Sequence, residues 1–229
     1  MSSRWGARFP CVSARRSNED RVRKVVESYD RAAEKYAEFR GPVSGAFRRL
    51  LDRLVDPLPN GATILDVGCG HGVPAQYLVD RGFRVIGLDG SARLLALARA
   101  AIPEAHFILG DMRTADPGGP FDAILAWDAV FHVPRSDHAA VFARFRSWVE
   151  AGGRLLVSLG GSGPEEFTSE MLGETFFYSG HAPEAAMRLL EDSGFEIEHW
   201  EVDDPSARGH IAVLGNARPL SGHSPSRGG

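Results

Sequence analysis

Cysteine, net charge and long apolar runs are all scarce in this chain of 229 residues. Its two cysteines, Cys11 and Cys69, build neither a disulfide framework nor a zinc cluster, so we expect a reducing compartment and no metal. No apolar stretch approaches the ~20 residues of a membrane-spanning helix, and the N-terminus lacks the apolar core of a signal peptide. A formal net charge of −4 gives no overall attraction to nucleic acid or anionic lipid. These absences favour a cytoplasmic protein that works without nucleic acid or a membrane.

The two ends of the chain are too polar to contribute to a hydrophobic core. Residues 1–18 carry several arginines and serines and no acid, which predicts a disordered leader or an over-long gene start. Residues 217–229 are mostly small and polar and predict a disordered tail. The remaining segment, 19–216, is long enough to form a single domain with its own core.

Between these ends, short β-rich runs alternate with longer helical patterns, which is typical of strand–helix–strand units around a parallel sheet. Seven runs are predicted to be strands, most of them too apolar for a half-exposed sheet: 62–68, 83–89, 105–111, 121–127, 153–160, 195–202 and 210–216. Helices are predicted at 72–81, 91–101, 137–150 and 183–193. The pattern therefore predicts an α/β fold with helices on both faces of the sheet.

Two further regions depart from this rhythm. Ahead of the first strand, 19–38 and 42–56 have helical spacing of apolar residues, and they either cover a ligand as an N-terminal helical cover or simply pack on the domain. Residues 161–182 interrupt the alternation with aromatic side chains among acids: Phe167, Phe176, Phe177 and Tyr178. We predict a lid here, because long connections inside compact domains are usually functional or mobile; a packed helical insertion is the alternative.

A glycine-rich turn after the first strand is the most informative motif. The apolar run from Ile64 leads directly into three alternate glycines, Gly68, Gly70 and Gly72. A dinucleotide fingerprint requires glycine where Val73 stands, which disfavours nicotinamide and flavin dinucleotides. Asp66, at the end of the strand, suits a ligand that carries an ammonium or sulfonium. The turn could also close strand onto helix without binding anything.

Acids end the next two strands as well. Asp89 closes the second strand, where a carboxylate can accept hydrogen bonds from both hydroxyls of a ribose. The third strand ends at Asp111 and Met112, a carboxylate for an adenine amino group and a flexible apolar side chain for the ring face. Since open α/β sheets bind ligands at the carboxyl ends of their strands, these acids are expected to line one crevice.

The run D-V-G-C-G-H-G at 66–72, the acid at Asp89 and the run Gly110-Asp111-Met112 resemble the class I S-adenosylmethionine-dependent methyltransferases. The resemblance implies a Rossmann-like, seven-stranded, mostly parallel sheet whose antiparallel last strand, 210–216, pairs with 195–202. It also implies S-adenosylmethionine as cofactor and S-adenosylhomocysteine as product.

The same resemblance implies roles for individual residues. In the family, the turn from Gly68 to Gly72 lies along the methionyl and ribose part of the cofactor, Asp89 holds the ribose, and Asp111 with Met112 frames adenine. The run Tyr29-Asp30-x-x-Ala33-x-x-Tyr36 resembles the small-molecule branch of the family, in which such tyrosines cover the methionyl end.

The fourth strand ends in Trp127-Asp128-Ala-Val-Phe-His132, at the position where the family keeps residues that face the transferred methyl group. His132, with Asp128 beside it, is the predicted general base, because histidine suits proton removal at neutral pH. Alternatively, His132 packs the loop and orients Asp128. Trp127 either contacts the cofactor or belongs to the core. Weaker candidates are Tyr178, His181 and His210.

The acceptor is expected to be a small, partly apolar molecule, because the predicted lid is rich in aromatics. O-methylation is favoured over N-, S- or C-methylation, since His132 could deprotonate a hydroxyl. The sequence W-D-A-V after the fourth strand differs from the N-P-P-Y type of relatives that methylate amines of nucleic-acid bases. Alternatives are a non-catalytic S-adenosylmethionine-binding module, a methyltransferase for RNA or protein, and a nucleotide-dependent oxidoreductase.

Overall fold

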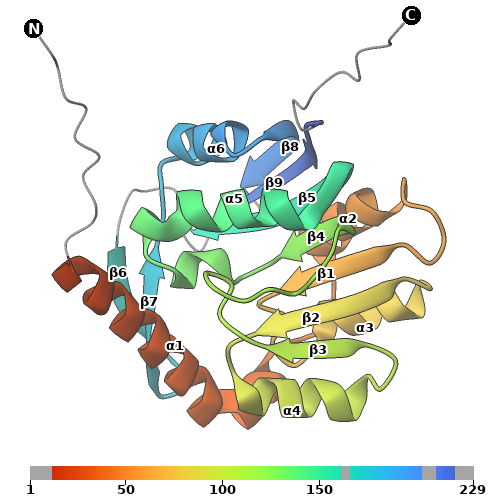
Figure 1. Ribbon diagram of the computed structural model, residues 1–229. Helices are drawn as coiled ribbons and strands as arrows, with labels where there is room; N and C mark the ends of the chain where they lie inside the picture. Colours follow the sequence, from red (N-terminus) through yellow and green to blue (C-terminus); the bar gives the residue numbers. More distant parts are fainter. Residues whose placement is uncertain (1–11, 161–165, 203–209, 220–229) are drawn as a thin grey trace, which may run out of the picture.

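The computed structural model describes residues 12–160, 166–202 and 210–219 and is built on a seven-stranded sheet (Figure 1). Its strand order is β3-β2-β1-β4-β5-β9-β8. The strands are β1 (Thr63–Val67), β2 (Arg84–Asp89), β3 (His106–Leu109), β4 (Phe121–Ala126), β5 (Val149–Gly160), β8 (Phe195–Val202) and β9 (His210–Ala217). The first five pair in parallel, whereas β9 runs antiparallel to both β5 and β8. All seven predicted strands and the antiparallel last strand are confirmed.

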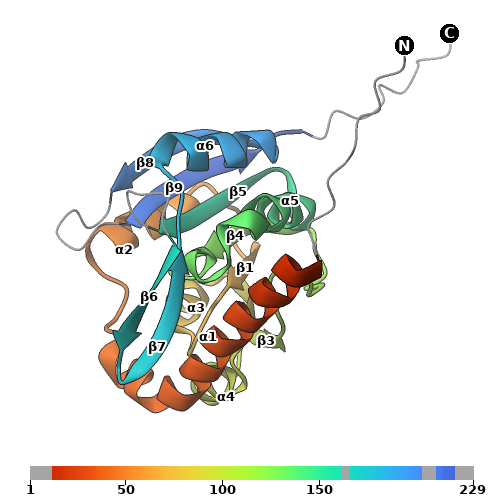
Figure 2. The same cartoon turned by 90° about the vertical axis from the view of Figure 1, so that its left-hand side faces the viewer.

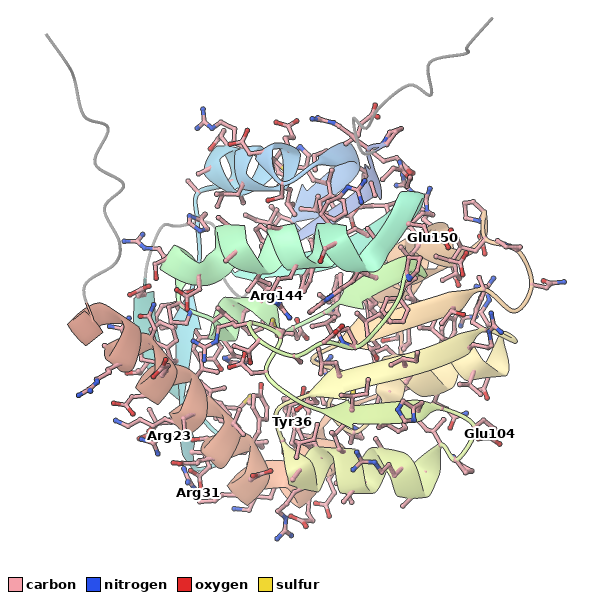
Figure 3. All side chains as sticks on the ribbon, viewed as in Figure 1. Arg23, Arg31, Tyr36, Glu104, Arg144 and Glu150 are labelled. Atoms are coloured by element: carbon pink, nitrogen blue, oxygen red, sulfur yellow. The ribbon has the colours of Figure 1, made fainter. Side chains whose placement is uncertain are left out.

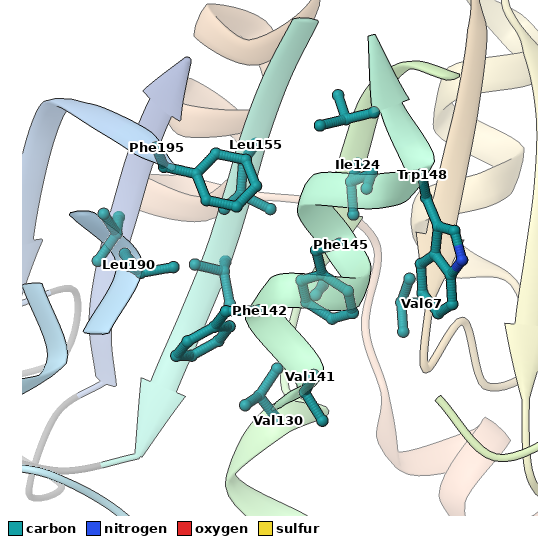
Figure 4. Packing of buried hydrophobic residues seen from close by; sticks show 14 of the residues in the cluster. Val67, Ile124, Val130, Val141, Phe142, Phe145, Trp148, Leu155, Leu190 and Phe195 are labelled. Atoms are coloured by element: carbon teal, nitrogen blue, oxygen red, sulfur yellow. The ribbon is translucent and has the colours of Figure 1, made fainter. Parts of the chain in front are cut away.

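Helices cover both faces of this sheet, as predicted. On one face lie α5 (His138–Trp148) and α6 (Pro183–Asp192), and on the other lie α2 (Gly45–Val55), α3 (Val73–Asp80) and α4 (Ala92–Ala101). Because side chains alternate across a strand, β1 to β5 and β9 each supply both cores, whereas the edge strand β8 supplies only the core beneath α5 and α6. In the α5 core, Phe142, Phe145 and Trp148 pack among strand side chains that include Ile124 and Leu155 (Figure 4).

Helix α1 (Val12–Phe39) begins earlier than the predicted start at residue 19. Residues 12–18 therefore belong to a helix and not to a disordered leader, while residues 1–11 lie outside the described part. No proline or glycine falls between residues 12 and 39 to end the helix. At this early turn, the Asn18 amide donates to Ser136 Oγ at 2.9 Å and to Asp137 Oδ1 at 3.0 Å. Although α1 has 28 residues, no helix among those described is long and apolar enough to cross a membrane.

The predicted lid contains a β-hairpin in place of the helical alternative. Strands β6 (Glu166–Met171) and β7 (Glu174–Ser179) are joined by Leu172 and Gly173, both with positive φ. Two such residues give a tight turn that suits the right-handed twist of a hairpin. Residues 161–165, which begin the predicted lid, lie outside the described part.

Helix α1 and the hairpin lie together at the carboxyl ends of the parallel strands (Figures 1 and 2). Between them, Val25 packs with Phe176 and Phe177. Ser28 Oγ donates to Thr175 O at 2.9 Å, and the half-exposed Arg31, labelled in Figure 3, pairs with Glu174 at 2.7 Å. The N-terminal helix thus covers the sheet edge at which the acids were expected to meet.

Candidate active site

A pocket opens at the carboxyl edge of the sheet, beneath α1. Most residues predicted for the site line it: Tyr29, Tyr36, Gly68, Gly70, Asp89, Asp111, Met112, Asp128 and His132. The predicted helical cover supplies an apolar wall of the pocket, formed by Val22, Val25 and Val26 on α1. The helical spacing of these valines is visible in the sequence. That they face the pocket depends on how α1 crosses the sheet edge, which the sequence does not show.

Trp127 does not line the pocket, and of its two predicted places the structure gives it the one in the core and not the one against the cofactor. Its ring stacks on Phe47 with centroids 4.2 Å apart, in the core beneath α2. Ala123 and Leu125 lie in the same core, so residue 127 continues their alternation along β4 and faces away from the opening.

Gly72 also lies outside the pocket lining. A side chain there would meet Ile102 Cδ1 at 2.6 Å and Ala98 Cβ at 3.4 Å. This glycine therefore lets the start of α3 approach the end of α4, which is a packing role. Of the weaker candidates, His181 packs edge-on to His138 at 5.1 Å, and the side chain of His210 lies outside the described residues.

Gly68 and Gly70 shape the turn after β1. Both have positive φ, at 72° and 56°, a conformation that favours glycine. A Cβ on Gly68 would lie 2.3 Å from Ala129 Cβ, so the turn approaches the segment after β4 as closely as its backbone allows. The Gly68 N–H donates to Leu88 O at 2.7 Å, and this bond ties the turn to β2.

Asp89 joins this turn to the start of α4. Its Oδ2 accepts from the Gly70 N–H at 2.9 Å, and its Oδ1 accepts from the Ser91 N–H at 2.7 Å. Burial raises the pKa of Asp89, while these N–H groups act in the opposite direction. Each carboxylate oxygen has two acceptor directions, so Asp89 can still accept from ligand hydroxyl groups.

Asp111 forms an ion pair that the sequence did not reveal. The Arg113 guanidinium donates to Asp111 Oδ2 at 2.7 Å and also reaches Asp137 Oδ2 at 3.3 Å. The Arg113 N–H donates to Asp111 Oδ1 at 2.8 Å. An adenine amino group, the partner predicted for Asp111, would share these oxygens with Arg113.

A second arginine holds the loop that carries Met112. Arg144 on α5, labelled in Figure 3, donates through Nε to Met112 O at 3.2 Å and through its terminal nitrogen to Ala115 O. The same guanidinium lies over the Trp148 ring, 5.0 Å from its centroid. Arg144 therefore fixes the backbone on which Met112 enters the pocket wall.

Asp66, on β1 ahead of the glycine turn, is almost fully buried and, unlike Gly68 and Asp89, does not line the pocket. Its Oδ2 has no hydrogen-bond partner among the described residues. Burial, together with the negative charge of Asp89, raises the pKa of Asp66 to about 8. A buried carboxyl group of this kind suits a pocket whose ligand brings positive charge.

Asp66→Asn is expected to change how the stability of the ligand-free protein depends on pH. The unfolded chain loses the Asp66 proton near pH ~3.9, whereas the folded chain keeps it up to about pH 8. Between these values the folded state holds the extra proton, so its stability falls as pH rises. Urea unfolding should show the wild type losing about 1.4 kcal/mol per pH unit relative to the variant, levelling above pH 8. Parallel curves for the two proteins would contradict this assignment.

At the other end of the pocket, Tyr29, His132 and Asp128 come together. Tyr29 Oη lies 2.8 Å from His132 Nε2, and His132 Nδ1 lies 2.8 Å from Phe177 O. Burial lowers the pKa of His132 to about 4. Asp128 has a left-handed backbone (φ 54°) and accepts from Arg40 at 2.9 Å. The two predicted catalytic residues are thus both in the pocket, and both already have partners.

Comparison with known proteins bears on this site. Residues 64–153 match the family model described as a methyltransferase domain. A trans-aconitate 2-methyltransferase from Azoarcus sp. (strain BH72) is 34% identical over 128 residues, which cover 55% of this chain and 49% of that protein. The one from Shigella dysenteriae serotype 1 (strain Sd197) is 30% identical over 176 residues, covering 72% of this chain and 68% of that protein.

Solved structures share the fold at low sequence identity. The 1,6-didemethyltoxoflavin-N1-methyltransferase of Burkholderia thailandensis, with bound 1,6-didemethyltoxoflavin and S-adenosylhomocysteine, is 18% identical with a TM-score of 0.68, covering 94% of each chain. The magnesium protoporphyrin IX methyltransferase of Synechocystis PCC 6803, with bound S-adenosylmethionine, is 18% identical with a TM-score of 0.70, covering 86% of this chain and 97% of that one.

The sheet order, the glycine turn and the acids at the strand ends are those of a nucleoside-binding α/β protein. The chain belongs to the class I S-adenosylmethionine-dependent methyltransferases. The matched segment spans about half the length of the Azoarcus relative and about two thirds of the Shigella relative.

Proposed function

We propose that this chain methylates a carboxylate oxygen of a small organic acid. When bound, S-adenosylmethionine supplies the methyl group, whose transfer to a carboxylate gives a methyl ester and S-adenosylhomocysteine without release of a proton. The observation that carries this proposal is that His132, the predicted base, and the carboxylates that line the pocket, Asp89, Asp111 and Asp128, already have partners, so an acceptor that arrives ionised fits the site. The trans-aconitate 2-methyltransferases, the relatives to which this chain is similar, are named for an acid.

Two features of the pocket lining, and the buried Asp66 next to it in charge contact with Asp89, fit S-adenosylmethionine. Gly68 and Gly70 form a turn that a ligand can approach closely, and Asp89 retains acceptor directions for the ribose hydroxyls. The unpartnered carboxyl of Asp66 suits a cationic ligand. Val22 and Val26 on α1, together with Met112, supply apolar lining for a flat base.

The hydrogen bonds of His132 argue against a role as general base. A carbonyl oxygen can only accept, so Phe177 O fixes the proton on Nδ1, and the lone pair on Nε2 faces the Tyr29 hydroxyl. A base also needs a pKa near the working pH, and that of His132 is about 4. A carboxylate acceptor, ionised at neutral pH, needs no base.

Local charge also favours an acidic acceptor. Arg40 follows the end of α1 and pairs with Asp128, which lines the pocket. The positive charge of Arg40 also interacts with Tyr36. Burial, together with the same Arg40 charge, lowers the pKa of His71. The Arg40 guanidinium can attract the carboxylate of an acceptor, while its ion pair with Asp128 holds the guanidinium in place.

Turnover with a panel of small di- and tricarboxylic acids, including trans-aconitate, tests the proposal. We expect S-adenosylhomocysteine together with an alkali-labile methyl ester, and a kcat/KM that changes less than about threefold between pH 6 and 9, because the acceptor is ionised throughout. The amide of the best acid is the matched control and should not react. Methylation of a phenol or an amine, with a rate that rises with pH, would overturn the carboxylate assignment.

A further inference from the structure

The contact between Tyr29 and His132 joins three parts of the chain that are far apart in sequence. Tyr29 comes from the middle of α1, His132 from the short 3-10 helix η1 (Val130–His132), and Phe177 from β7. Both hydrogen bonds of the His132 ring are 2.8 Å long, and the residue is 7% exposed. The imidazole is thus held from both sides and has a single orientation.

The direction of each hydrogen bond follows from what its partners can do. Phe177 O accepts, so His132 Nδ1 carries the proton and Nε2 is the acceptor. Tyr29 has to donate to Nε2, because burial keeps both side chains neutral: it raises the pKa of Tyr29 and lowers that of His132. The Tyr29 hydroxyl has no other hydrogen bond among the described residues, so its oxygen keeps its acceptor capacity, and Tyr29 is one of the residues that line the pocket.

We propose that His132 is a positioning residue that engages the Tyr29 proton and thereby presents the oxygen of Tyr29 to the pocket as an acceptor only. This rests on the proposed use of the pocket for S-adenosylmethionine. An oxygen that can only accept favours a ligand group with positive charge and polarised C–H bonds, which the sulfonium of S-adenosylmethionine has and the neutral thioether of S-adenosylhomocysteine lacks. Tyr29 would therefore help the pocket to prefer substrate over product.

Two histidine variants separate positioning from packing. In His132→Gln, the amide oxygen reaches toward the place of Nε2 and can still accept from Tyr29. In His132→Asn, the shorter amide can keep the donor to Phe177 O but offers nothing to Tyr29. If His132 acts by orienting the hydroxyl, the two variants differ in their preference for the charged ligand.

Calorimetric titration with S-adenosylmethionine and with S-adenosylhomocysteine tests the proposal. We expect Tyr29→Phe to weaken S-adenosylmethionine binding about fivefold while changing S-adenosylhomocysteine binding less than about twofold. His132→Asn should match Tyr29→Phe, and His132→Gln should recover most of the wild-type ratio. Tyr77→Phe, which removes a tyrosine hydroxyl bonded to Asp52 outside the pocket lining, is the matched control and should leave both affinities unchanged.

Equal losses for both ligands in Tyr29→Phe, or equal ratios in the two histidine variants, would overturn the proposal. Tyr29→Phe removes a single oxygen atom and is expected to fold. If a histidine variant does not fold, the Tyr29→Phe result alone tests the proposal. Failure of the proposed function itself looks different, because the wild type would then bind neither ligand or would bind S-adenosylmethionine without methylating any acid.

Discussion

Asp89→Asn is expected to weaken S-adenosylmethionine binding about 100-fold. The carboxylate accepts from the Gly70 N–H and the Ser91 N–H through different oxygens. An amide has one oxygen, so one of these N–H groups would face an NH₂ group and lose its partner, and the ribose hydroxyls would lose an ionised acceptor. A lost bond to a charged group costs about 1.5–3 kcal/mol, and about 2.7 kcal/mol corresponds to 100-fold in affinity.

The fold should survive this substitution. Burial raises the pKa of Asp89, so a neutral amide is easier to bury than the carboxylate it replaces. Asp122→Asn is the matched control: Asp122 Oδ2 accepts from the Thr63 N–H at 2.7 Å, where β1 begins, at the opposite edge of the sheet. Titration calorimetry should show near wild-type affinity for this control. An Asp89→Asn protein that binds as the control does would remove Asp89 from the cofactor site.

The sequence predicts the sheet well because strands buried on both faces appear as apolar runs. Runs such as 121–127 have few polar residues and end in acids, so both the strand and its functional end are readable. The side-chain direction of Trp127 was also readable in principle. Ala123 and Leu125 share its alternation, and counting from either of them places Trp127 in the core.

Other parts of the site depend on contacts that no local pattern encodes. The pairing of Tyr29 with His132 arises because α1 crosses the sheet edge, and the fork of Arg113 on Asp111 needs a particular loop conformation. The hairpin at 166–179 was hidden for a related reason: its turn is Leu172-Gly173 and not one of the usual asparagine–glycine or aspartate–glycine pairs. The aromatic residues of this segment predicted a functional lid, but they did not predict that the lid contains two strands.

Helix α1 and the hairpin make the pocket a composite of distant segments. Asn18 reaches Asp137, which also binds Arg113 beside Asp111, the acid predicted to meet adenine. Near the middle of the helix, Asp30 accepts from the Ser91 hydroxyl at 2.6 Å, next to Asp89. The cover therefore contacts the residues that position both ends of the expected nucleoside, which couples its docking to the geometry of the pocket.

Gly68→Ala is expected to abolish measurable S-adenosylmethionine binding and to destabilise the protein. The new Cβ would lie 2.3 Å from Ala129 Cβ, so either the turn or the segment that carries Asp128 and His132 has to move. The φ of 72° adds conformational strain for alanine, about 1 kcal/mol, and overpacking of this kind typically costs a further 1–3 kcal/mol.

Gly82→Ala separates strain from the clash. Gly82 has a similar φ of 85°, but a Cβ there meets nothing within 4 Å. Urea unfolding should therefore show a loss of about 1 kcal/mol for Gly82→Ala and about 2–4 kcal/mol for Gly68→Ala. Only Gly68→Ala should lose ligand binding, because only its new Cβ meets the segment after β4, at Ala129. If both variants bind S-adenosylmethionine equally well, the close approach of Gly68 to Ala129 does not control the shape of the pocket.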